Sequence, residues 1–391
     1  MSEPIYLDYQ ATTPLAPEAY AVMEPWLKDK FWNPHSAHVG GRQAAATVEV
    51  ARERVAALLP SGGRVIFTSG ATEAINLAIK GCELPVSALA TEHAAVLDCV
   101  EFLGGKILPE LVSRELKALR SNSGTAREAR GRGVAGVSTP AALSAPPSVA
   151  VATATAPSKL GEELVCVMLI NNEIGIIQPI AEIAETAHAN GGLLLCDAVQ
   201  AYGRIPIPSG PDLIAISAHK IHGPKGIGAL WVRDGIYLAP LMHGGGQEQG
   251  LRSGTLSPAL CAGFGAAAKL AAERMSQDAA HVETLWNRAT ELFADWTING
   301  SSTHRYKGNL NIRRDGLDVA RLMSECREVM FSAGSACASG SGRPSHVLRA
   351  IGLTDAQAKS SIRLGWGRYT TIEEIERAAA LINTAAERQL A

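Results

Sequence analysis

Residues 214–231 read Ile-Ala-Ile-Ser-Ala-His-Lys-Ile-His-Gly-Pro-Lys-Gly-Ile-Gly-Ala-Leu-Trp. The apolar start predicts a buried strand, which ends in Ser217, His219 and Lys220 before a turn rich in glycine and proline. A lysine that leaves a buried sheet there would point into a crevice. Desolvation would lower the pKa of its amine and prepare it to form a Schiff base with a carbonyl cofactor. A surface lysine after a strand would give the same pattern, so this stretch alone leaves both interpretations open. The glycines that follow precede a strand rather than a helix, which argues against a dinucleotide-binding loop.

The composition is that of a globular protein without a marked charge. The chain has 391 residues, a formal net charge of −2 and 47% hydrophobic residues. This length suffices for two domains, and the near-neutral charge gives no reason to expect nucleic acid or a membrane as the main partner. The seven cysteines form no CxxC pair, which is typical of free thiols in a reducing compartment. We find no pattern of a signal peptide or a membrane-spanning helix and therefore expect a soluble, cytoplasmic protein.

A candidate phosphate site lies between Arg64 and Ala78, where an apolar strand leads through small residues into a predicted helix. Gly70, Ala71 and Thr72 stand at the start of this helix, where backbone N–H groups have no intrahelical partner. Those donors and the Thr72 hydroxyl would form a cradle for a phosphate group. No Gly-Lys-Ser/Thr follows, which excludes a P-loop. A capped turn that binds nothing remains the alternative.

Two further predicted strands end in polar residues. Residues 164–170 lead into Asn171 and Asn172, and residues 193–197 end in Asp197. Strands that alternate with helices and carry polar residues at their carboxyl ends predict an open α/β sheet with a ligand crevice along that edge. Asp197 is then either a helix cap or a partner of a cofactor. A long helix is expected at about 43–59, and a helix-rich segment at about 256–296.

Four single features have both a functional and an ordinary interpretation. His93 precedes a predicted helix, although a lone histidine is more often packed or solvated than catalytic. Asn33 belongs to a loop that is either simply packed or the rim of a pocket. Cys337 lies among very small residues and is either an incidental exposed thiol or a nucleophile on a mobile arm. Arg363 lies on a predicted strand and would suit a carboxylate clamp, although a surface arginine is the simpler alternative.

Nine short motifs occur in order along nearly the whole chain: YLDYQATTP (6–14), SGATE (69–73), TEH (91–93), NNEIG (171–175), CDAVQ (196–200), SAHK (217–220), RSGT (252–255), GSAC (334–337) and SIR (361–363). This set resembles the cysteine desulfurases of the NifS/IscS type. Those enzymes belong to the class V aminotransferase-like group of fold-type I enzymes, which use pyridoxal 5'-phosphate.

The resemblance implies an α/β fold with a large domain, in which a mainly parallel sheet lies between helices, and a smaller α/β C-terminal domain. The large, cofactor-binding domain is predicted at 16–257, and the small domain with the Cys337 loop at 1–15 and 258–391. Residues 121–160 are dominated by Ala, Ser, Pro and Gly and contain no aromatic residue. Such a segment buries little surface, so we expect a mobile surface insertion in the large domain.

Roles for single residues follow from the same resemblance. Lys220 is similar to the Schiff-base lysine that also moves the α-proton, Asp197 to the partner of the pyridine nitrogen, and His93 to the ring-stacking histidine with an acid–base role. Arg363, with weaker support from Asn33, would bind the substrate carboxylate. Asn172 and Gln200 would lie around the ring oxygen of the cofactor. The phosphate would be bound by Gly70, Ala71, Thr72, Ser217 and His219, and by Thr255 from the other subunit of a homodimer.

The implied activity is conversion of L-cysteine to L-alanine. The sulfur would be held as a persulfide on Cys337 and passed to an acceptor protein for iron–sulfur cluster assembly or tRNA thiolation. Alternatives are a selenocysteine lyase or another C–S lyase on the same scaffold, and a non-catalytic protein that binds sulfur carriers. A zinc site at His219 and His222 would lack a third ligand nearby in the sequence. The family commonly has arginine at the position of Gln249, and the segment after the last predicted helix is short. Because of these two differences, it stays open whether the protein docks to a scaffold protein.

Overall fold

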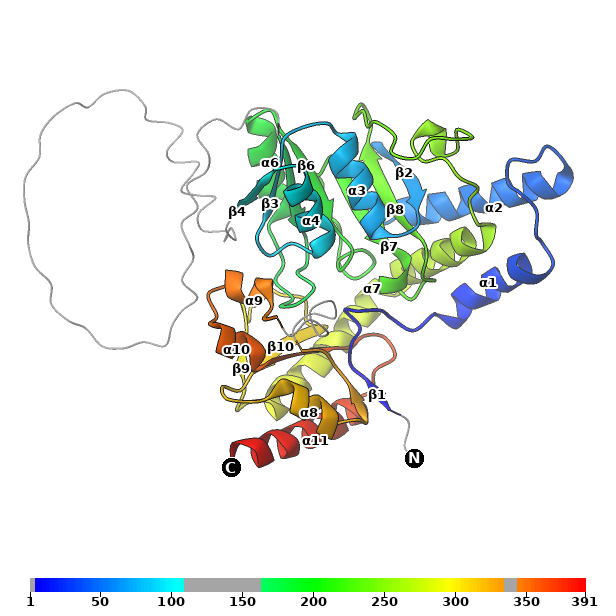
Figure 1. The fold of residues 1–391 in the computed structure, drawn as a ribbon. Coiled ribbons are helices and arrows are strands. Elements are labelled where there is room, and N and C mark those ends of the chain that lie inside the picture. The colour runs from blue at the N-terminus through cyan, green and yellow to red at the C-terminus, as the bar shows by residue number, and fades with distance from the viewer. Residues whose placement is uncertain (1–3, 109–162, 334–342) are drawn as a thin grey trace, which may run out of the picture.

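The computed structural model describes residues 4–108, 163–333 and 343–391 (Figure 1). Two α/β parts lie one above the other in this view, and both chain ends belong to the lower part. Cys337 and the predicted insertion at 121–160 lie outside the described residues.

A seven-stranded sheet forms the upper part. Its strands, in spatial order, are β2 (Gly63–Thr68), β8 (Gly228–Arg233), β7 (Leu213–Ser217), β6 (Leu193–Asp197), β5 (Leu164–Met168), β3 (Val86–Leu89) and β4 (Lys106–Leu108). The five strands from β7 to β4 pair in parallel, whereas β8 runs antiparallel to both of its neighbours. The predicted mainly parallel sheet is therefore confirmed.

Helices cover both faces of this sheet. One face packs against α2 (Val39–Ala56), α6 (Ile180–Ala189) and the first half of α7 (Pro258–Leu292), and the other against α3 (Ala71–Gly81) and α4 (Ala94–Phe102). Successive strand residues enter different cores, since Val65 and Phe67 face the α2 side while Ile66 faces α3. A strand that is buried on both faces has an unbroken run of apolar residues. This pattern made the strands predictable from the sequence.

The lower part has its own apolar core. β1 (Ile5–Tyr6) pairs in parallel with β11 (Val329–Met330), and β10 (Asn309–Arg313) lies between β12 (Ser361–Gly365) and β9 (Thr297–Ile298) in an antiparallel sheet. Buried residues of α8 (Val319–Glu325), α11 (Ile372–Leu390) and the second half of α7 complete this core. The remaining helices of the described residues are α1 (Pro17–Lys28), α9 (His346–Ala350), α10 (Asp355–Lys359) and the short 3-10 turns η1 (Ala218–Lys220) and η2 (Glu248–Gly250).

The predicted helix at 43–59 and the predicted helix-rich segment at 256–296 correspond to α2 and α7, whose ends differ from the prediction by a few residues. α2 begins at Val39 because the His38 side chain accepts a hydrogen bond from Gly41 N and caps the helix. α7 begins at Pro258, after Ser257, whose hydroxyl accepts from Leu260 N. Because α7 contributes to both cores, the exact boundary between the two domains stays a prediction.

Gly228 offers a test of how closely the sheet packs on the loop before α3. A Cβ atom at this position would lie 2.6 Å from Ile216 O and 2.7 and 2.8 Å from backbone atoms of Gly70. We expect Gly228→Ala to lower the free energy of unfolding by about 1–3 kcal/mol, because backbone must move to make room. Chemical denaturation followed by circular dichroism measures this change.

Gly70→Ala is the matched control. A Cβ atom there meets nothing within 4 Å, and the φ of Gly70 is extended at 161°. Its free energy of unfolding should therefore stay close to that of the parent chain. Equal destabilisation by the two substitutions would contradict the packing account.

Candidate active site

A cavity of about 600 Å³ opens at the carboxyl ends of β5, β6 and β7. The first turns of α3 and α4, the N-terminal segment and the C-terminal region also line it. Open α/β sheets bind ligands at this edge. The cavity brings together eleven predicted site residues: Gly70, Ala71, Thr72, His93, Asn172, Asp197, Gln200, Ser217, His219, Lys220 and Arg363.

Lys220 lies in η1, directly after β7, and its side chain enters the cavity. Its ammonium group donates hydrogen bonds to the backbone carbonyls of Gln10 and Ala11, the second at 2.7 Å. Burial lowers the pKa of Lys220 from 10.5 to about 7, and the positive charges of Arg204 and Arg363 act in the same direction. A neutral amine is therefore well populated at pH 7, as the prediction of a Schiff-base lysine requires.

Asp197 ends β6 and is buried in the cavity wall. Its Oδ1 accepts a hydrogen bond from Val199 N at 2.9 Å. Burial raises the pKa of Asp197, whereas that hydrogen bond and the charges of His93 and Lys220 oppose the rise. A ligand that brings a positive charge to this carboxylate, such as a pyridinium ring, would replace the hydration that burial removes.

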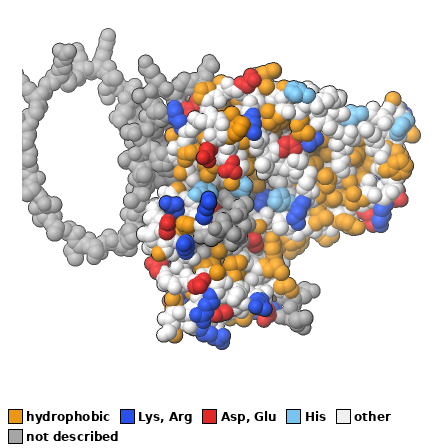
Figure 2. Space-filling view, viewed as in Figure 1, with side chains coloured by type: hydrophobic (Ala, Val, Ile, Leu, Met, Phe, Trp, Pro, Cys, Tyr) orange, Lys and Arg blue, Asp and Glu red, His pale blue; other side chains and the backbone are white. Residues whose placement is uncertain are grey.

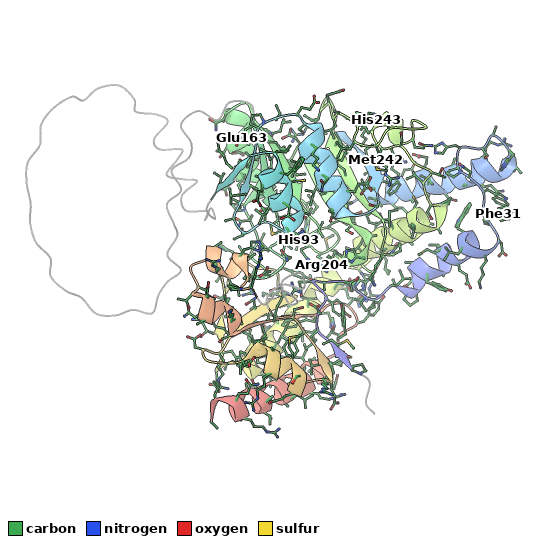
Figure 3. All side chains as sticks on the ribbon, in the orientation of Figure 1. Phe31, His93, Glu163, Arg204, Met242 and His243 are labelled. Atoms are coloured by element: carbon green, nitrogen blue, oxygen red, sulfur yellow. The ribbon has the colours of Figure 1, made fainter. Side chains whose placement is uncertain are left out.

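His93 caps α4, because its Nδ1 accepts a hydrogen bond from Ala95 N at 3.1 Å. This bond uses one ring nitrogen and leaves Nε2 for a ligand in the cavity. Figure 3 places His93 at the end of α4 that faces the lower part of the molecule. The same cap also explains why the helix begins where the sequence predicted it.

The start of α3 carries the predicted phosphate cradle. Its N-cap is Gly70, and no side chain caps the helix, so the first N–H groups are available to a ligand. Thr72, Ser217 and His219 line the same cavity. The pKa of His219 is lowered to about 4 by burial and by neighbouring positive charges, so its imidazole is neutral at pH 7.

Asn172 and Gln200 differ in what they offer to a ligand. Asn172 Oδ1 is buried and has no hydrogen-bond partner among the described residues, which leaves an acceptor for a cavity ligand. Both ends of the Gln200 amide are already used, since Nε2 donates to Gln10 O at 2.9 Å and Oε1 accepts from Arg204 at 2.8 Å. Gln200 therefore holds the N-terminal segment in place, and its contact with the cofactor stays a prediction.

Arg363 is buried on β12 and points into the cavity rather than to solvent. Its guanidinium forms an ion pair with Asp8 at 2.7 Å and donates to Asn172 O at 3.0 Å and to Ser332 Oγ at 3.3 Å. The group is thus fixed in orientation before any ligand arrives. A fixed guanidinium in a cavity suits the binding of a carboxylate.

Two predicted site residues in the described part of the chain are not part of this cavity. Asn33 and Thr255 are exposed and are not among its lining residues. Figure 3 shows the loop that carries Phe31 at the far end of α1 and α2, away from His93. Cys337 lies outside the described residues. Gln249, in η2, adopts a left-handed φ of 57° and does not line the cavity either.

The sequence prediction missed other residues that line the cavity. Gln10, Glu173, Lys225 and His346 are among them. His346 Nε2 contacts Glu92 O at 2.9 Å, next to His93, so it links α9 to the cavity wall. Gln10 and Glu173 lie within motifs that carried the resemblance, and Lys225 lies in the stretch that suggested the Schiff base. Their places in those motifs were the available indication.

The described residues contain no group of three or more His, Cys, Asp or Glu side chains that could hold a metal ion. His219 and His222, whose spacing in the sequence would suit a zinc pair, have separate partners, since His219 Nδ1 contacts Thr12 and His222 Nδ1 contacts Pro14 O. Within the described ranges, no helix is both long and apolar enough to cross a membrane.

The sequence profile of the aminotransferase class-V family matches residues 5–107 and 150–378. The chain belongs to this family. The unmatched residues 108–149 include most of the predicted insertion. The resemblance to NifS/IscS-type enzymes and the predicted fold class are confirmed, and so is pyridoxal phosphate as the family's cofactor. The residues present fit that group, with an amine at Lys220, a carboxylate at Asp197, free N–H donors at α3 and an unpaired acceptor at Asn172.

Relatives and solved structures agree on the same group of enzymes. A protein named cysteine desulfurase IscS, from Rickettsia akari (strain Hartford), is 39% identical over 97% of this chain and 90% of its own length. The structure of a NifS-like protein from Rickettsia africae ESF-5 has a TM-score of 0.81 and 27% identity, covering 98% of this chain and 100% of that one. The structure of SspA in complex with cysteine has a TM-score of 0.72 and 30% identity, covering 94% and 99%.

The environment of Lys220 predicts an unusual titration in the cofactor-free protein. The amine should lose its proton near pH 7, because burial and two arginines favour its neutral form. NMR titration of the lysine ε-carbon signal measures the midpoint, and Lys220→Met assigns the signal by removing it.

The same shift has a second consequence for stability. Between about pH 7 and pH 10.5 the unfolded chain holds a proton here that the folded chain has lost, so the contribution of Lys220 to stability rises with pH in this window. A midpoint above pH 9 would contradict the desolvated site.

Proposed function

We propose that this chain is a cysteine desulfurase that converts L-cysteine to L-alanine and holds the sulfur on Cys337. The observation that carries the proposal is the joint placement of Lys220, Asp197 and Arg363 in one cavity. A desolvated amine, a buried carboxylate and a fixed guanidinium meet the needs of a carbonyl cofactor and an amino-acid substrate.

The cofactor would be held at three points. Lys220 would bind its carbonyl carbon, Asp197 its pyridine nitrogen, and the start of α3 with Ser217 and His219 its phosphate. When bound, pyridoxal phosphate supplies an electron sink that stabilises the negative charge left when the substrate loses its α-proton. Asp197 would support this sink by pairing with the ring nitrogen and holding it protonated.

The chain's own residues do the rest of the work on the substrate. Arg363 binds the carboxylate of L-cysteine and so fixes the orientation of its α-carbon. Once the substrate's amino group has taken its place on the cofactor's carbonyl carbon, the amine of Lys220 is free to accept the α-proton and to return it, since its pKa of about 7 favours neither form strongly at pH 7.

In the next step the sulfur atom of the substrate is transferred to Cys337. The Cys337 thiolate forms an S–S bond to the substrate sulfur as the substrate's C–S bond breaks. A proton delivered to the β-carbon completes L-alanine, and Cys337 keeps the persulfide. The other six cysteines, Cys82, Cys99, Cys166, Cys196, Cys261 and Cys326, are free thiols with pKa values raised by burial, which makes them poor nucleophiles.

Three aspects of the wider setting belong to the same proposal. The persulfide passes to an acceptor protein that serves iron–sulfur cluster assembly or tRNA thiolation. The enzyme acts in the cytoplasm, which the six free thiols support. It works as a homodimer in which Thr255 reaches the partner's phosphate site and Asn33 supports substrate binding. Exposed apolar residues at the α1–α2 end support such a dimer (Figure 2), among them Leu27, Phe31 and Val39, which are 61%, 85% and 66% exposed.

The proposal is tested by incubating the holoenzyme with L-cysteine. We expect equal amounts of L-alanine and transferable sulfur, and a mass increase of one sulfur atom on the peptide that contains Cys337. Cys337→Ala should abolish the persulfide and reduce sulfur release to background. Alanine is measured by chromatography and the persulfide by mass spectrometry after alkylation.

Cys326→Ala is the matched control, because Cys326 is a buried thiol of the lower core and should leave the persulfide unchanged. Full sulfur release by Cys337→Ala would instead identify a C–S lyase. A purified chain that binds pyridoxal phosphate but makes no alanine would support the non-catalytic alternative.

Arg363 should determine how well the substrate binds. Arg363→Lys keeps the charge but loses the planar donor pair, so we expect kcat/KM for L-cysteine to fall by about 10- to 100-fold, mostly through a higher KM. Steady-state kinetics of alanine formation measures both constants.

Arg305→Lys serves as the control for that variant. Arg305 is also a buried arginine and donates to the carbonyls of Ile174 and Asn309, but it does not line the cavity. It should change stability without changing KM. A KM unaffected by Arg363→Lys would remove Arg363 from the substrate site.

A further inference from the structure

Lys225 lies in the turn between η1 and β8 and lines the cavity together with Gly226. The residue is exposed, and within the described residues it has no hydrogen bond or ion pair. The two other lysine or arginine side chains that line the cavity are already engaged. Lys220 donates to two backbone carbonyls, and Arg363 is paired with Asp8. Among the described lysine and arginine side chains that line the cavity, Lys225 is therefore the one whose ammonium has no hydrogen-bond or ion-pair partner.

The packing of β8 places the turn near the start of α3. Gly228, three residues after Lys225, pairs with Thr68 of β2 and Ser217 of β7. A Cβ atom on Gly228 would lie within 2.8 Å of the Gly70 backbone. Since Gly70 is the N-cap of α3, the turn with Lys225 is adjacent to the predicted phosphate cradle. Lys225 and the cradle residues line the same cavity, and the charge of Lys225 is felt at His219.

The cradle itself carries little positive charge. A bound phosphate monoester has a charge of about −1.5 to −2 at pH 7. Thr72 and Ser217 are neutral, and His219 is neutral as well because its pKa is about 4. The helix end contributes the equivalent of only about half a positive charge. Most of the phosphate charge would have no partner among these groups.

We propose that Lys225 is the cationic ligand of the cofactor's phosphate group. The inference rests on the proposed pyridoxal phosphate function and adds to it the one charged side chain of the phosphate site. Its ammonium would donate hydrogen bonds to the phosphate oxygens. Its role is to bind and position the cofactor, and it takes no part in the chemistry at the substrate.

The test compares two cofactor forms on the full chain stripped of its cofactor. Binding of pyridoxal phosphate and of pyridoxal, which lacks the phosphate, is titrated by absorbance for the parent chain, Lys225→Gln, Lys225→Arg and Lys106→Gln. Lys106, an exposed lysine on β4 at the far edge of the sheet, is the matched control. We expect Lys225→Gln to bind pyridoxal phosphate about tenfold more weakly, the loss of one charge-assisted hydrogen bond. Its affinity for pyridoxal should not change.

Further arms make the result specific. Lys225→Arg keeps the charge and should retain most of the affinity, and Lys106→Gln should bind like the parent chain. In Lys225→Gln the affinity for pyridoxal phosphate should also depend less on salt than in the parent chain.

Two results would overturn this inference without affecting the proposed function. The first is that Lys225→Gln binds pyridoxal phosphate as tightly as the parent chain does. The second is that Lys225→Gln loses the same affinity for pyridoxal as for pyridoxal phosphate. If the parent chain bound neither form, the proposed function would fail and this inference with it. That failure is distinguishable, because it would affect all four proteins alike.

Discussion

The amine of Lys220 is kept out of water by the chain segment that contains Gln10 and Ala11, and the rest of the site depends on this contact. The carbonyls of Gln10 and Ala11 accept its hydrogen bonds. Thr13 fastens the same segment to η1, because its N and Oγ1 both donate to His219 O and its Oγ1 accepts from His222 N. One segment thus buries the amine and also accepts its hydrogen bonds. An enzyme that uses an amine as a nucleophile needs both, since burial alone would leave donors without partners.

A buried ion pair connects distant parts of the chain at the substrate end of the cavity. Asp8 and Arg363 meet at 2.7 Å, and Ser332 donates to the Asp8 carboxylate at 3.0 Å. Ser332 directly precedes the part of the chain that contains Cys337, and its backbone pairs with that of Arg363. Arg363 is itself buried, so removal of Asp8 would leave a buried charge without this partner, which is destabilising. The orientation of Arg363 therefore depends on the lower part of the molecule as much as on the sheet.

The sequence predicted features that have a local pattern and missed those that depend on long-range contacts. Strands buried on both faces read as apolar runs, and their polar ends pointed to Asp197 and Lys220. The helix after a run of small residues pointed to Thr72. By contrast, the contact of Gln10 with Lys220 joins residues about 210 positions apart, and no spacing rule connects them. His346 and Lys225 are single polar residues in ordinary surroundings, so only their placement around the cavity distinguishes them. Helix ends were displaced because single caps, such as His38, decide them.

The continuity of α7 has a mechanical consequence. This 35-residue helix is about 50 Å long, and its first half packs under the large sheet while its second half packs in the lower core. Its only proline is at the first position, where it causes no kink. A hinge between the two parts would have to bend this rod, at the cost of backbone hydrogen bonds. Substrate entry and sulfur delivery must then rely on side chains and short loops, while the frame that spaces Lys220 from Arg363 stays stiff.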